Sequence, residues 1–365
     1  MSTIHARVAL QQRVLPEYRA PLFNALGAVC TGGLEVFAGL PRTHEAIATV
    51  NQLKDARFVR ARNMHLFSGK TYFCIQQGFL YWLEHFKPQV LIVEANPRYL
   101  STPAAIQWMH RWHLPVIGWG LGAPKAGRVE TRLRKQFLGS LDAIIAYSQT
   151  GAQQYISAGF PPERVFVAPN AAAPRPTAPA PVRSADFRNG KPSLLFVGRL
   201  QERKRLDLLM QACSTLPSSK QPELVIVGDG PDRARLEALA RSVYPTAQFT
   251  GSKHGEELEP LFASADLFVL PGTGGLAVQQ AMAHALPVMV GEADGTQAEL
   301  VRNENGWLLH SVTVESLSAH LADALSDGAR LRQMGTASYR IVSEEVNLDV
   351  MVDAFTNAIE TVLKR

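Results

Sequence analysis

Arg199 and Lys204 lie five positions apart in the segment LLFVGRLQERKRLDLL, which leads from an apolar run into a helical pattern. The run ends at Gly198, and Lys204 lies where we expect the helix to begin. A planar guanidinium and a compact ammonium at this spacing can converge on one diphosphate. Because the helix macrodipole disfavours cations at a helix N-terminus, the segment predicts a phosphate-binding function for both side chains.

A second segment with chemical potential is PGTGGLAVQQAMAHALPV, residues 271–288. Gly274 and Gly275 allow close backbone approach, and the amides of Leu276 and Ala277 would face an anion at the start of a helix. The segment contains no acidic residue. It therefore raises the question of which groups would bind the hydroxyls of a sugar nucleotide.

A third segment, ELVIVGDGPDRARLEAL, turns sharply at Asp229 and Gly230. Glycine, aspartate and proline at this place are typical of a turn that precedes a helix, with Pro231 at the first helical position. Contact with a ligand and a purely structural turn both remain open for this segment.

Composition limits the class of protein. The 365 residues are 46% hydrophobic and 19% charged, which predicts two globular domains rather than disorder. Three well-separated cysteines (Cys30, Cys74 and Cys213) favour neither a disulfide framework nor a metal pair. No apolar run of about 18 residues and no signal-peptide core occur, so we expect a soluble or peripheral protein in the cytoplasm, at the inner face of the plasma membrane.

Charge is unevenly distributed along the chain. Residues 1–175 contain 19 Lys and Arg against 9 Asp and Glu, whereas the remainder contains 18 against 23. A basic first half predicts contact with an anionic partner such as a phospholipid surface or a lipid diphosphate. Zinc-finger spacing and an RNA-binding aromatic signature are absent, which argues against nucleic acid. There is also no HExxH pair or Asp-x-Asp motif, so we expect neither a metal nor a cofactor.

Apolar runs alternate with helical patterns along the whole chain, which predicts parallel α/β sheets covered on both faces. In the first half, residues 68–86 and 102–113 have the three-and-four spacing of helices. An aperiodic Ala/Pro-rich stretch then interrupts the alternation. We therefore predict two doubly wound, Rossmann-like domains facing each other across a cleft, with an N-terminal domain (1–175), a linker (176–190), a C-terminal domain (191–345) and a final helix (346–365) that packs back on the N-terminal domain.

Residues 193–330 resemble the donor-binding domain of the retaining glycosyltransferases of family 4, which have the two-domain GT-B fold. The resemblance rests on the ordered series FVGRLQERK, VGDGPDRARLE, FTGSKHGEELEPLFASADLFVLP, GLAVQQAMAHALPV and AELVRNENGWLL. In the first half it is looser and is carried by DAIIAYSQTGAQQY and RVFVAPNA. It implies that Arg199 and Lys204 bind the donor diphosphate, and that the other donor-binding residues are Gly198, Asp229, Gly230, Gly251, Lys253, Gly274, Gly275, Leu276, Ala277 and Gln280.

The sequence departs from this family at its signature. The family has two glutamates eight positions apart, the first facing the donor sugar and the second the ribose, and here those positions are Gly272 and Gln280. Glutamine can preserve the ribose contact as a neutral hydrogen bond. Glycine offers no side chain, so a contact to the sugar must come from the backbone or be absent. The histidine that many members have after another strand is also replaced, by the segment Trp119, Gly120 and Leu121.

Several first-half residues are candidates for the acceptor side of the cleft. Tyr18 and Arg19 follow the first predicted strand, Glu94 and Asn96 follow another, and Gly120 lies in a glycine-rich loop. A helix cap or an ordinary surface residue is the alternative for each polar candidate. Arg128, Arg132 and Lys135 recur at helical spacing and would face either lipid headgroups or solvent.

Together these features predict a glycosyltransferase that moves a sugar from a nucleotide-sugar donor to a hydroxyl of a glycan or lipid-linked acceptor, with retention. Synthesis of a surface polysaccharide or glycolipid is the expected setting, and contact with an anionic membrane is expected for the basic half. The alternatives are a catalytically weak GT-B protein that binds a nucleotide or serves as a partner subunit, and a nucleotide-sugar epimerase on the same fold.

Overall fold

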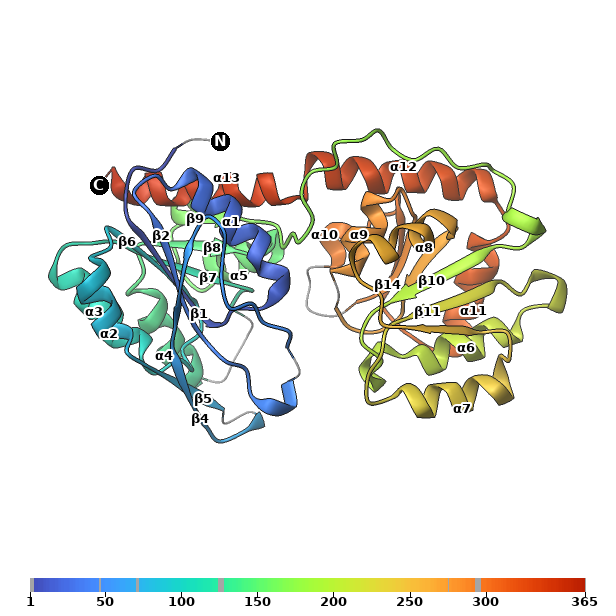
Figure 1. Cartoon of the computed structure of the whole chain (residues 1–365), viewed down its shortest axis with the longest axis horizontal. Coiled ribbons are helices and arrows are strands. Elements are labelled where there is room, and N and C mark those ends of the chain that lie inside the picture. The colour runs from blue at the N-terminus through green and yellow to red at the C-terminus, as the bar shows by residue number, and fades with distance from the viewer. Residues whose placement is uncertain are drawn as a thin grey trace. The chain divides into compact units, whose positions relative to one another are not determined.

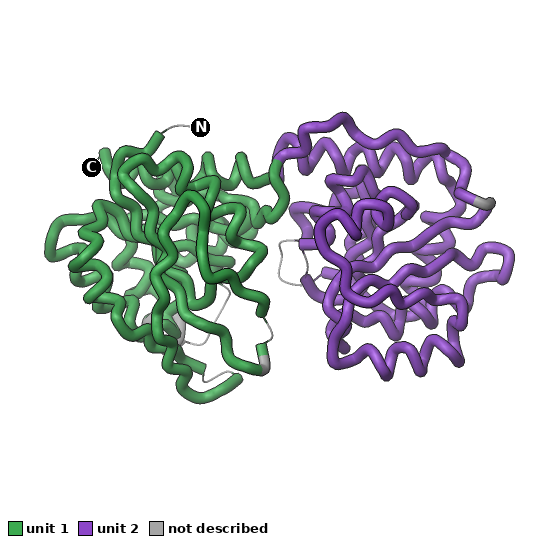
Figure 2. Tube along the Cα trace, viewed as in Figure 1, with its two compact units in different colours: residues 1–174, 347–365 green, residues 175–346 purple. Residues whose placement is uncertain are grey.

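The chain forms two compact units, which are described separately. The computed structural model describes residues 3–45, 47–69, 72–123, 128–274, 276–292 and 297–364. Unit 1 comprises Met1–Pro174 and Asn347–Arg365, and unit 2 comprises Arg175–Val346 (Figure 2). The C-terminal helix thus belongs to unit 1, and the Ala/Pro-rich segment belongs to unit 2.

Unit 1 is built on a parallel sheet of seven strands in the order β3-β2-β1-β6-β7-β8-β9 (Figure 1). The order reverses between β1 and β6, and the crevice beside such a reversal is where open α/β sheets bind ligands. Most of the strands are buried along their length, which explains their near-continuous apolar sequences. Their bounds are β1 (Val8–Val14), β2 (Leu34–Gly39), β3 (Arg57–Arg60), β6 (Val90–Glu94), β7 (Val116–Gly120), β8 (Ala143–Ala146) and β9 (Val165–Val167).

Helices cover both faces of this sheet. Trp119 on β7 packs against Phe23 of α1 and Phe355 of α13, with ring centroids 6.3 and 5.0 Å away. Asn347 caps α13 by accepting a hydrogen bond from the Val350 amide at 3.0 Å. The helices of unit 1 are α1 (Ala20–Val29), α2 (Phe79–Phe86), α3 (Thr102–Arg111), α4 (Arg128–Leu138), α5 (Gln149–Ser157) and α13 (Leu348–Leu363), with 3₁₀ turns at Glu17–Arg19, Thr43–Glu45 and Pro162–Arg164.

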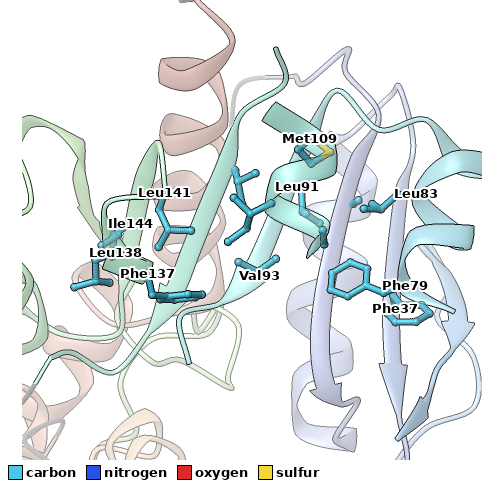
Figure 3. Close-up of a cluster of buried hydrophobic side chains, with 14 of the residues drawn as sticks. Phe37, Phe79, Leu83, Leu91, Val93, Met109, Phe137, Leu138, Leu141 and Ile144 are labelled. Atoms are coloured by element: carbon cyan, nitrogen blue, oxygen red, sulfur yellow. The ribbon is translucent and has the colours of Figure 1, made fainter. Parts of the chain in front are cut away.

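The opposite face of the sheet carries an extensive apolar core. Figure 3 shows Leu91 and Val93 of β6 among side chains from other strands and from the helices that cover them. Phe37 stacks on Phe79 at 5.3 Å and on Trp82 at 4.9 Å, which fixes α2 against β2. This core holds the strands whose carboxyl ends carry the polar side chains described below.

The prediction of a helix over residues 68–86 is wrong for its first half. Phe73–Gln77 is a strand, β5, which pairs antiparallel with β4 (Arg62–Leu66). Gly78, with φ of 85°, separates this strand from α2 by adopting a left-handed conformation that glycine tolerates well. The apolar positions of β5 alternate and those of α2 recur every three or four residues. Because the two elements follow each other directly, their apolar positions together looked like those of one helix.

Unit 2 has a six-stranded parallel sheet in the order β12-β11-β10-β13-β14-β15, which reverses between β10 and β13. The strands are β10 (Ser193–Val197), β11 (Glu223–Val227), β12 (Gln248–Gly251), β13 (Leu267–Leu270), β14 (Val288–Gly291) and β15 (Gly306–Leu309). The helices are α6 (Leu206–Thr215), α7 (Arg233–Val243), α8 (Glu259–Ser264), α9 (Ala277–Ala283), α10 (Gln297–Leu300), α11 (Val314–Ala324) and α12 (Gly328–Glu344), with 3₁₀ turns at Arg188–Gly190, Glu202–Lys204, Ser218–Lys220 and Gly255–Glu257.

Part of the predicted linker is bound to unit 2. The Arg183 guanidinium donates to four backbone carbonyls at 2.7–2.9 Å, those of Phe262, Ala263, Ala265 and His284. Arg332 donates to the Ser184 carbonyl and forms an ion pair with Asp266 at 2.6 Å. The lack of a helical or strand period identified this segment as a connection. The contacts that Arg183 makes with unit 2 could not be predicted from its composition.

Candidate functional site

The loops after β10 and β13 meet at the carboxyl edge of the unit 2 sheet, because these two strands are neighbours. The Lys204 ammonium donates to the carbonyl oxygens of Thr273 and Gly274 at 2.8 and 2.9 Å. Arg203 donates to the Thr273 hydroxyl at 2.9 Å, and the Thr273 amide donates to the Arg203 carbonyl at 3.1 Å. The structure therefore brings together the two segments that the sequence singled out separately.

Gly272 is packed against the backbone of the first loop. A Cβ atom at this position would lie 2.0 Å from the Arg203 carbonyl oxygen and 2.5 Å from the Lys204 Cα. These distances are far below van der Waals contact, so the present backbone has no room for a side chain. At the position of the family's first glutamate, the backbones of the two loops thus lie too close together for a glutamate side chain to fit.

Lys204 is buried, with 6% of its surface exposed. Burial, and secondarily the neighbouring Arg203 charge, lower the pKa of the Lys204 ammonium to about 8. The two described acceptors of Lys204 are neutral carbonyls rather than a carboxylate, and neutral acceptors compensate less for desolvation. The ammonium therefore changes charge close to physiological pH.

We expect this titration to appear in the pH dependence of donor use. Below pH 8 the Lys204 side chain is charged, and above it the neutral amine attracts a diphosphate less. Donor kcat/KM should therefore fall about tenfold per pH unit above about pH 8. Lys204→Arg keeps its charge and should show a flat profile up to about pH 10. An identical alkaline limb in both proteins would assign the fall to another group.

The other residues of this edge differ in their surroundings. Arg199 follows Gly198 directly and is exposed, whereas its neighbour Leu200 is fully buried. Leu200 donates its amide to the Asp229 carbonyl at 2.9 Å, and a Cβ at Gly230 would lie 2.2 Å from the Leu200 carbonyl oxygen. The Gly-Asp-Gly turn therefore packs on the Arg199 loop and positions it.

Charged side chains near this turn have partners within unit 2. Asp229 is exposed, accepts the Gly230 amide at 2.7 Å and pairs with Arg233 at 3.0 Å, and these contacts lower the pKa of its carboxyl. Lys253 follows Gly251 and pairs with Glu257 at 2.9 Å. Asp229 follows β11, the strand next to β10, and Lys253 follows β12, one strand further from the Arg199 loop.

The two glutamines of the second segment have opposite environments. Gln279 is buried and donates to the Val346 carbonyl at 2.5 Å. Gln280 is exposed, so its amide is accessible at the surface of α9. Leu276 and Ala277 form the start of α9, Gly274 has φ of 68°, and Gly275 lies outside the described residues.

In unit 1, Glu94 ends β6 beside the point where the strand order reverses. Its carboxylate accepts the Arg13 amide at 3.1 Å, and its own amide donates to Gln11 at 3.1 Å. Burial raises the pKa of the Glu94 carboxyl, while the Arg13 amide and the Tyr99 hydroxyl act in the opposite direction. Glu94 is therefore a partly buried, hydrogen-bonded carboxyl group beside the reversal of the strand order.

The structure adds neighbours of Glu94 that sequence reasoning missed. Arg13 pairs with Glu45 at 2.8 Å, and Arg42 pairs with the same carboxylate at 3.0 Å. Although burial opposes it, hydrogen bonds from the two arginines lower the pKa of Glu45 to about 2. The one sequence signal was the polar triplet Gln11, Gln12 and Arg13 inside the otherwise apolar first strand.

Arg19 is enclosed by its own unit. The residue is 5% exposed, and its guanidinium donates to Asn170 at 2.6 Å and lies 5.0 Å from the Trp119 ring centroid and 5.3 Å from that of Tyr147. Such a cation packed on aromatic faces joins the ends of β1, β7 and β8. The neighbouring Tyr18 is half exposed.

Asn96 and Gly120 have local structural roles. The Asn96 side chain accepts the Arg98 amide at 3.1 Å, which closes the turn after β6. A Cβ at Gly120 would lie 2.5 Å from the Tyr155 hydroxyl, so glycine is needed there for packing. Among the described residues, no cluster of three His, Cys, Asp or Glu side chains could hold a metal ion.

Comparisons with known proteins show what unit 2 is similar to. Residues 182–341 match the family described as Glycosyl transferases group 1. Over 148 residues the chain is 40% identical to a GDP-mannose-dependent alpha-mannosyltransferase of Mycobacterium tuberculosis, covering 40% of this chain and 36% of that protein. Over 194 residues it is 30% identical to a GDP-mannose-dependent alpha-(1-6)-phosphatidylinositol monomannoside mannosyltransferase of the same species, covering 49% and 50%. The chain thus spans between a third and a half of these relatives.

The fold comparison covers the whole chain. The structure of HepE from Anabaena in complex with UDP superposes with a TM-score of 0.71 over 98% of this chain and 100% of that one, at 14% identity. At this identity the likeness concerns the fold alone. The chain therefore has the GT-B fold, and residues 182–341 of its unit 2 are similar to the group 1 glycosyltransferases.

Proposed function

We propose that this protein is a retaining glycosyltransferase whose donor is a nucleotide sugar bound by unit 2. The observation that carries the proposal is the junction of the β10 and β13 loops, where buried Lys204 bonds Thr273 and Gly274; exposed Arg199 lies in the same loop as Lys204. A lysine ammonium has three N–H donors, so two bonds to carbonyls leave one for a phosphate oxygen. The match of this unit to group 1 glycosyltransferases supports the same assignment.

In the proposed reaction, the bond between the anomeric carbon and the donor phosphate oxygen breaks while the acceptor hydroxyl bonds that carbon from the same face. The hydroxyl proton passes to the departing phosphate oxygen, so no separate base is required. Arg199 and Lys204 stabilise the charge that develops on the diphosphate. Lys204 is buried and held by two carbonyls, so its charge acts in a partly dry environment, where electrostatic stabilisation is stronger than in water.

We propose the Glu94 edge of unit 1 as the acceptor side. Its partly buried carboxyl and the Arg13 and Tyr99 side chains lie at the reversal of the strand order, where doubly wound sheets bind ligands. A glycan or lipid-linked acceptor would present hydroxyls to such a group. The basic character of the first half of the chain supports a phosphate-bearing, lipid-linked acceptor.

The donor that we propose is GDP-mannose, because the mycobacterial relatives of this chain are named as GDP-mannose-dependent. Thermal unfolding with GDP, UDP and ADP tests the nucleotide. GDP at a hundred times its Kd should stabilise the protein by about 2.7 kcal/mol, and the other two should have little effect at the same concentration. Stabilisation by UDP but not GDP would contradict the choice of donor.

Turnover then separates an enzyme from a nucleotide-binding subunit. GDP-mannose and a panel of lipid-linked acceptors are incubated with the protein, and the anomeric configuration of any product is determined by NMR. An α-linked product from the α-linked donor supports retention. Binding of GDP without transfer to any acceptor would favour the partner-subunit alternative, for which the blocked position at Gly272 is the structural argument. Interconversion of the free donor without an acceptor would instead reveal an epimerase.

A further inference from the structure

The β4–β5 hairpin of unit 1 has an inverted polarity. Its inward positions carry polar side chains or cysteine, and they are Asn63, His65, Cys74 and Gln76. The outward face begins with the polar pair Arg62–Gln77, and its next two pairs, Met64–Ile75 and Leu66–Phe73, are apolar and at least partly exposed. An antiparallel hairpin on a domain surface normally buries its apolar face and presents its polar face to water. Here the arrangement is reversed, so the outward face has the composition of a contact surface.

The inward side chains explain why the hairpin is held in this orientation. Asn63 donates to the Arg13 and Leu40 carbonyls at 2.7 and 2.9 Å. Buried Gln76 hydrogen-bonds Gln11 and donates to the Gln12 carbonyl at 3.0 Å. The polar side is thus fixed to β1 by hydrogen bonds, which leaves the apolar side facing outward.

The tip of the hairpin continues the apolar face. Phe67 is 75% exposed and has φ of 58°, a left-handed conformation that is unusual for a bulky residue. Glycine or asparagine would adopt this conformation more easily. The exposed Phe67 ring therefore extends the apolar surface of the hairpin beyond β4.

At its other end the hairpin joins a groove beside α2. Gln77 contacts the Met64 sulfur at 2.8 Å and also lines a groove of about 510 Å³ between α2 and the edge strand β3. Phe37, Trp82 and Phe86 line this groove, and Tyr81, 67% exposed, stands at its margin. The outward face of the hairpin and this groove form one surface, here called the hairpin face.

The flank of the hairpin face is basic. Arg57, Arg60 and Arg62 lie within six residues on β3 and β4. Glu35 is the carboxylate among the described residues that line the groove; it pairs with Arg57 at 2.9 Å and accepts a hydrogen bond from Trp82. Arginines thus outnumber carboxylates along this margin of the surface.

Exposed apolar side chains are concentrated in the same unit. Among the described residues, the large hydrophobic side chains with high exposure include Leu40, Met64, Phe67, Leu80, Tyr81, Leu100 and Trp112 in unit 1. Val182 is the one in unit 2. Exposure of this kind together with basic charge is typical of proteins that bind the interface of an anionic membrane.

We infer that the hairpin face docks on an anionic phospholipid bilayer, with Phe67 and Met64 entering the interfacial region and Arg60 and Arg62 at the headgroups. This inference deepens the proposed function by naming where the membrane that carries a lipid-linked acceptor contacts the protein, and it rests on that function for its purpose. It replaces the α4 stretch as the main contact. In that stretch Arg132 and Lys135 are exposed, and the Arg128 side chain lies outside the described residues. The described part of the chain contains no helix long and apolar enough to cross a membrane.

Co-sedimentation of the full chain with vesicles tests the inference. Vesicles of phosphatidylcholine with 30% phosphatidylglycerol, on the order of the anionic content of bacterial and plasma membranes, are compared with phosphatidylcholine alone. The protein should bind the anionic vesicles at low salt. The double variant Met64→Ser/Phe67→Ser should bind these vesicles about tenfold more weakly. Arg60→Gln/Arg62→Gln should weaken binding by a comparable factor at low salt, and by less at high salt, where the charges are screened.

Val182→Ser is the matched control, because it removes an almost fully exposed apolar side chain from unit 2. Its vesicle binding should equal that of the unchanged protein. Failure of the unchanged protein to bind anionic vesicles, or equal binding by Met64→Ser/Phe67→Ser, would overturn the inference. A change from dimer to monomer in that variant, with unaltered vesicle binding, would instead identify the hairpin face as an interface between two copies.

Stabilisation by nucleotide distinguishes this inference from the proposed function. The hairpin-face variants should unfold at the temperature of the unchanged protein and retain its stabilisation by GDP. Lost vesicle binding with intact GDP stabilisation therefore concerns the membrane surface alone. Absent GDP stabilisation with intact vesicle binding would contradict the proposed donor and leave the docking surface in place.

Discussion

Replacing Lys204 with alanine should lower kcat for sugar transfer by about 10²–10³-fold, the usual effect of removing one preorganised charged donor. The substitution removes the cation proposed to stabilise the leaving diphosphate. It also leaves the Thr273 and Gly274 carbonyls without the ammonium that now bonds them. Steady-state kinetics with GDP-mannose measure the loss.

Arg199→Ala separates the charge effect from any effect on folding, because the Arg199 side chain is exposed. Its expected loss is about 10²-fold, with unchanged thermal stability. Lys220→Ala is the control, since Lys220 is an exposed cation in the 3₁₀ turn before β11. It should retain full activity. Full turnover in both Arg199→Ala and Lys204→Ala would refute the assignment of these two residues.

Restoring the family's first glutamate should damage the protein rather than improve it. In Gly272→Glu, the new Cβ would lie 2.0 Å from the Arg203 carbonyl oxygen, so the β10 and β13 loops must separate. We expect the free energy of unfolding to fall by about 2–3 kcal/mol, with a decrease in Tm of roughly 5–10 °C. Transfer activity should fall as well, because the same movement displaces Lys204.

Gln280→Glu restores the second glutamate and provides the matched comparison. Gln280 is exposed on α9, so its replacement should change Tm by about 1 °C or less. Gly272→Ala tests the role of the Cβ atom alone and should reproduce most of the loss of stability. Thermal unfolding of the three variants decides the matter. A Gly272→Glu protein as stable as the unchanged one would show that the two loops separate at little cost.

Several features of the fold could be predicted because they depend on local patterns. Buried parallel strands require apolar runs, and the helices between them require the three-and-four period, so the alternation predicts two doubly wound units. The loop residues Arg199 and Lys204 were found in the same way, by their position after such a run, whereas Gln280 was implied by the resemblance to the family's signature. Their roles in donor binding remain predictions.

The β4–β5 hairpin was not predicted from the sequence, because its polar residues face inward and its apolar residues face outward. A strand with polar residues inward and apolar residues outward has the same alternation as an ordinary strand, and next to α2 it resembled one long helix. Which face is buried depends on Gln11 and Arg13, from a strand some fifty residues earlier in the chain. Periodicity within a segment contains no information about that partner.

By itself, the sequence determined the two-unit α/β architecture and the segments from which a donor site would be built. Only the tertiary structure decided how those segments contact one another and how the contact changes their side chains. Gly272 was an absent glutamate in the sequence, but in the fold it allows the two loops to touch. Lys204 was one cation of a pair, but burial at that contact lowers its pKa to about 8. The reason is that close packing and desolvation arise where distant segments meet, whereas periodicity and turn chemistry are properties of neighbouring residues.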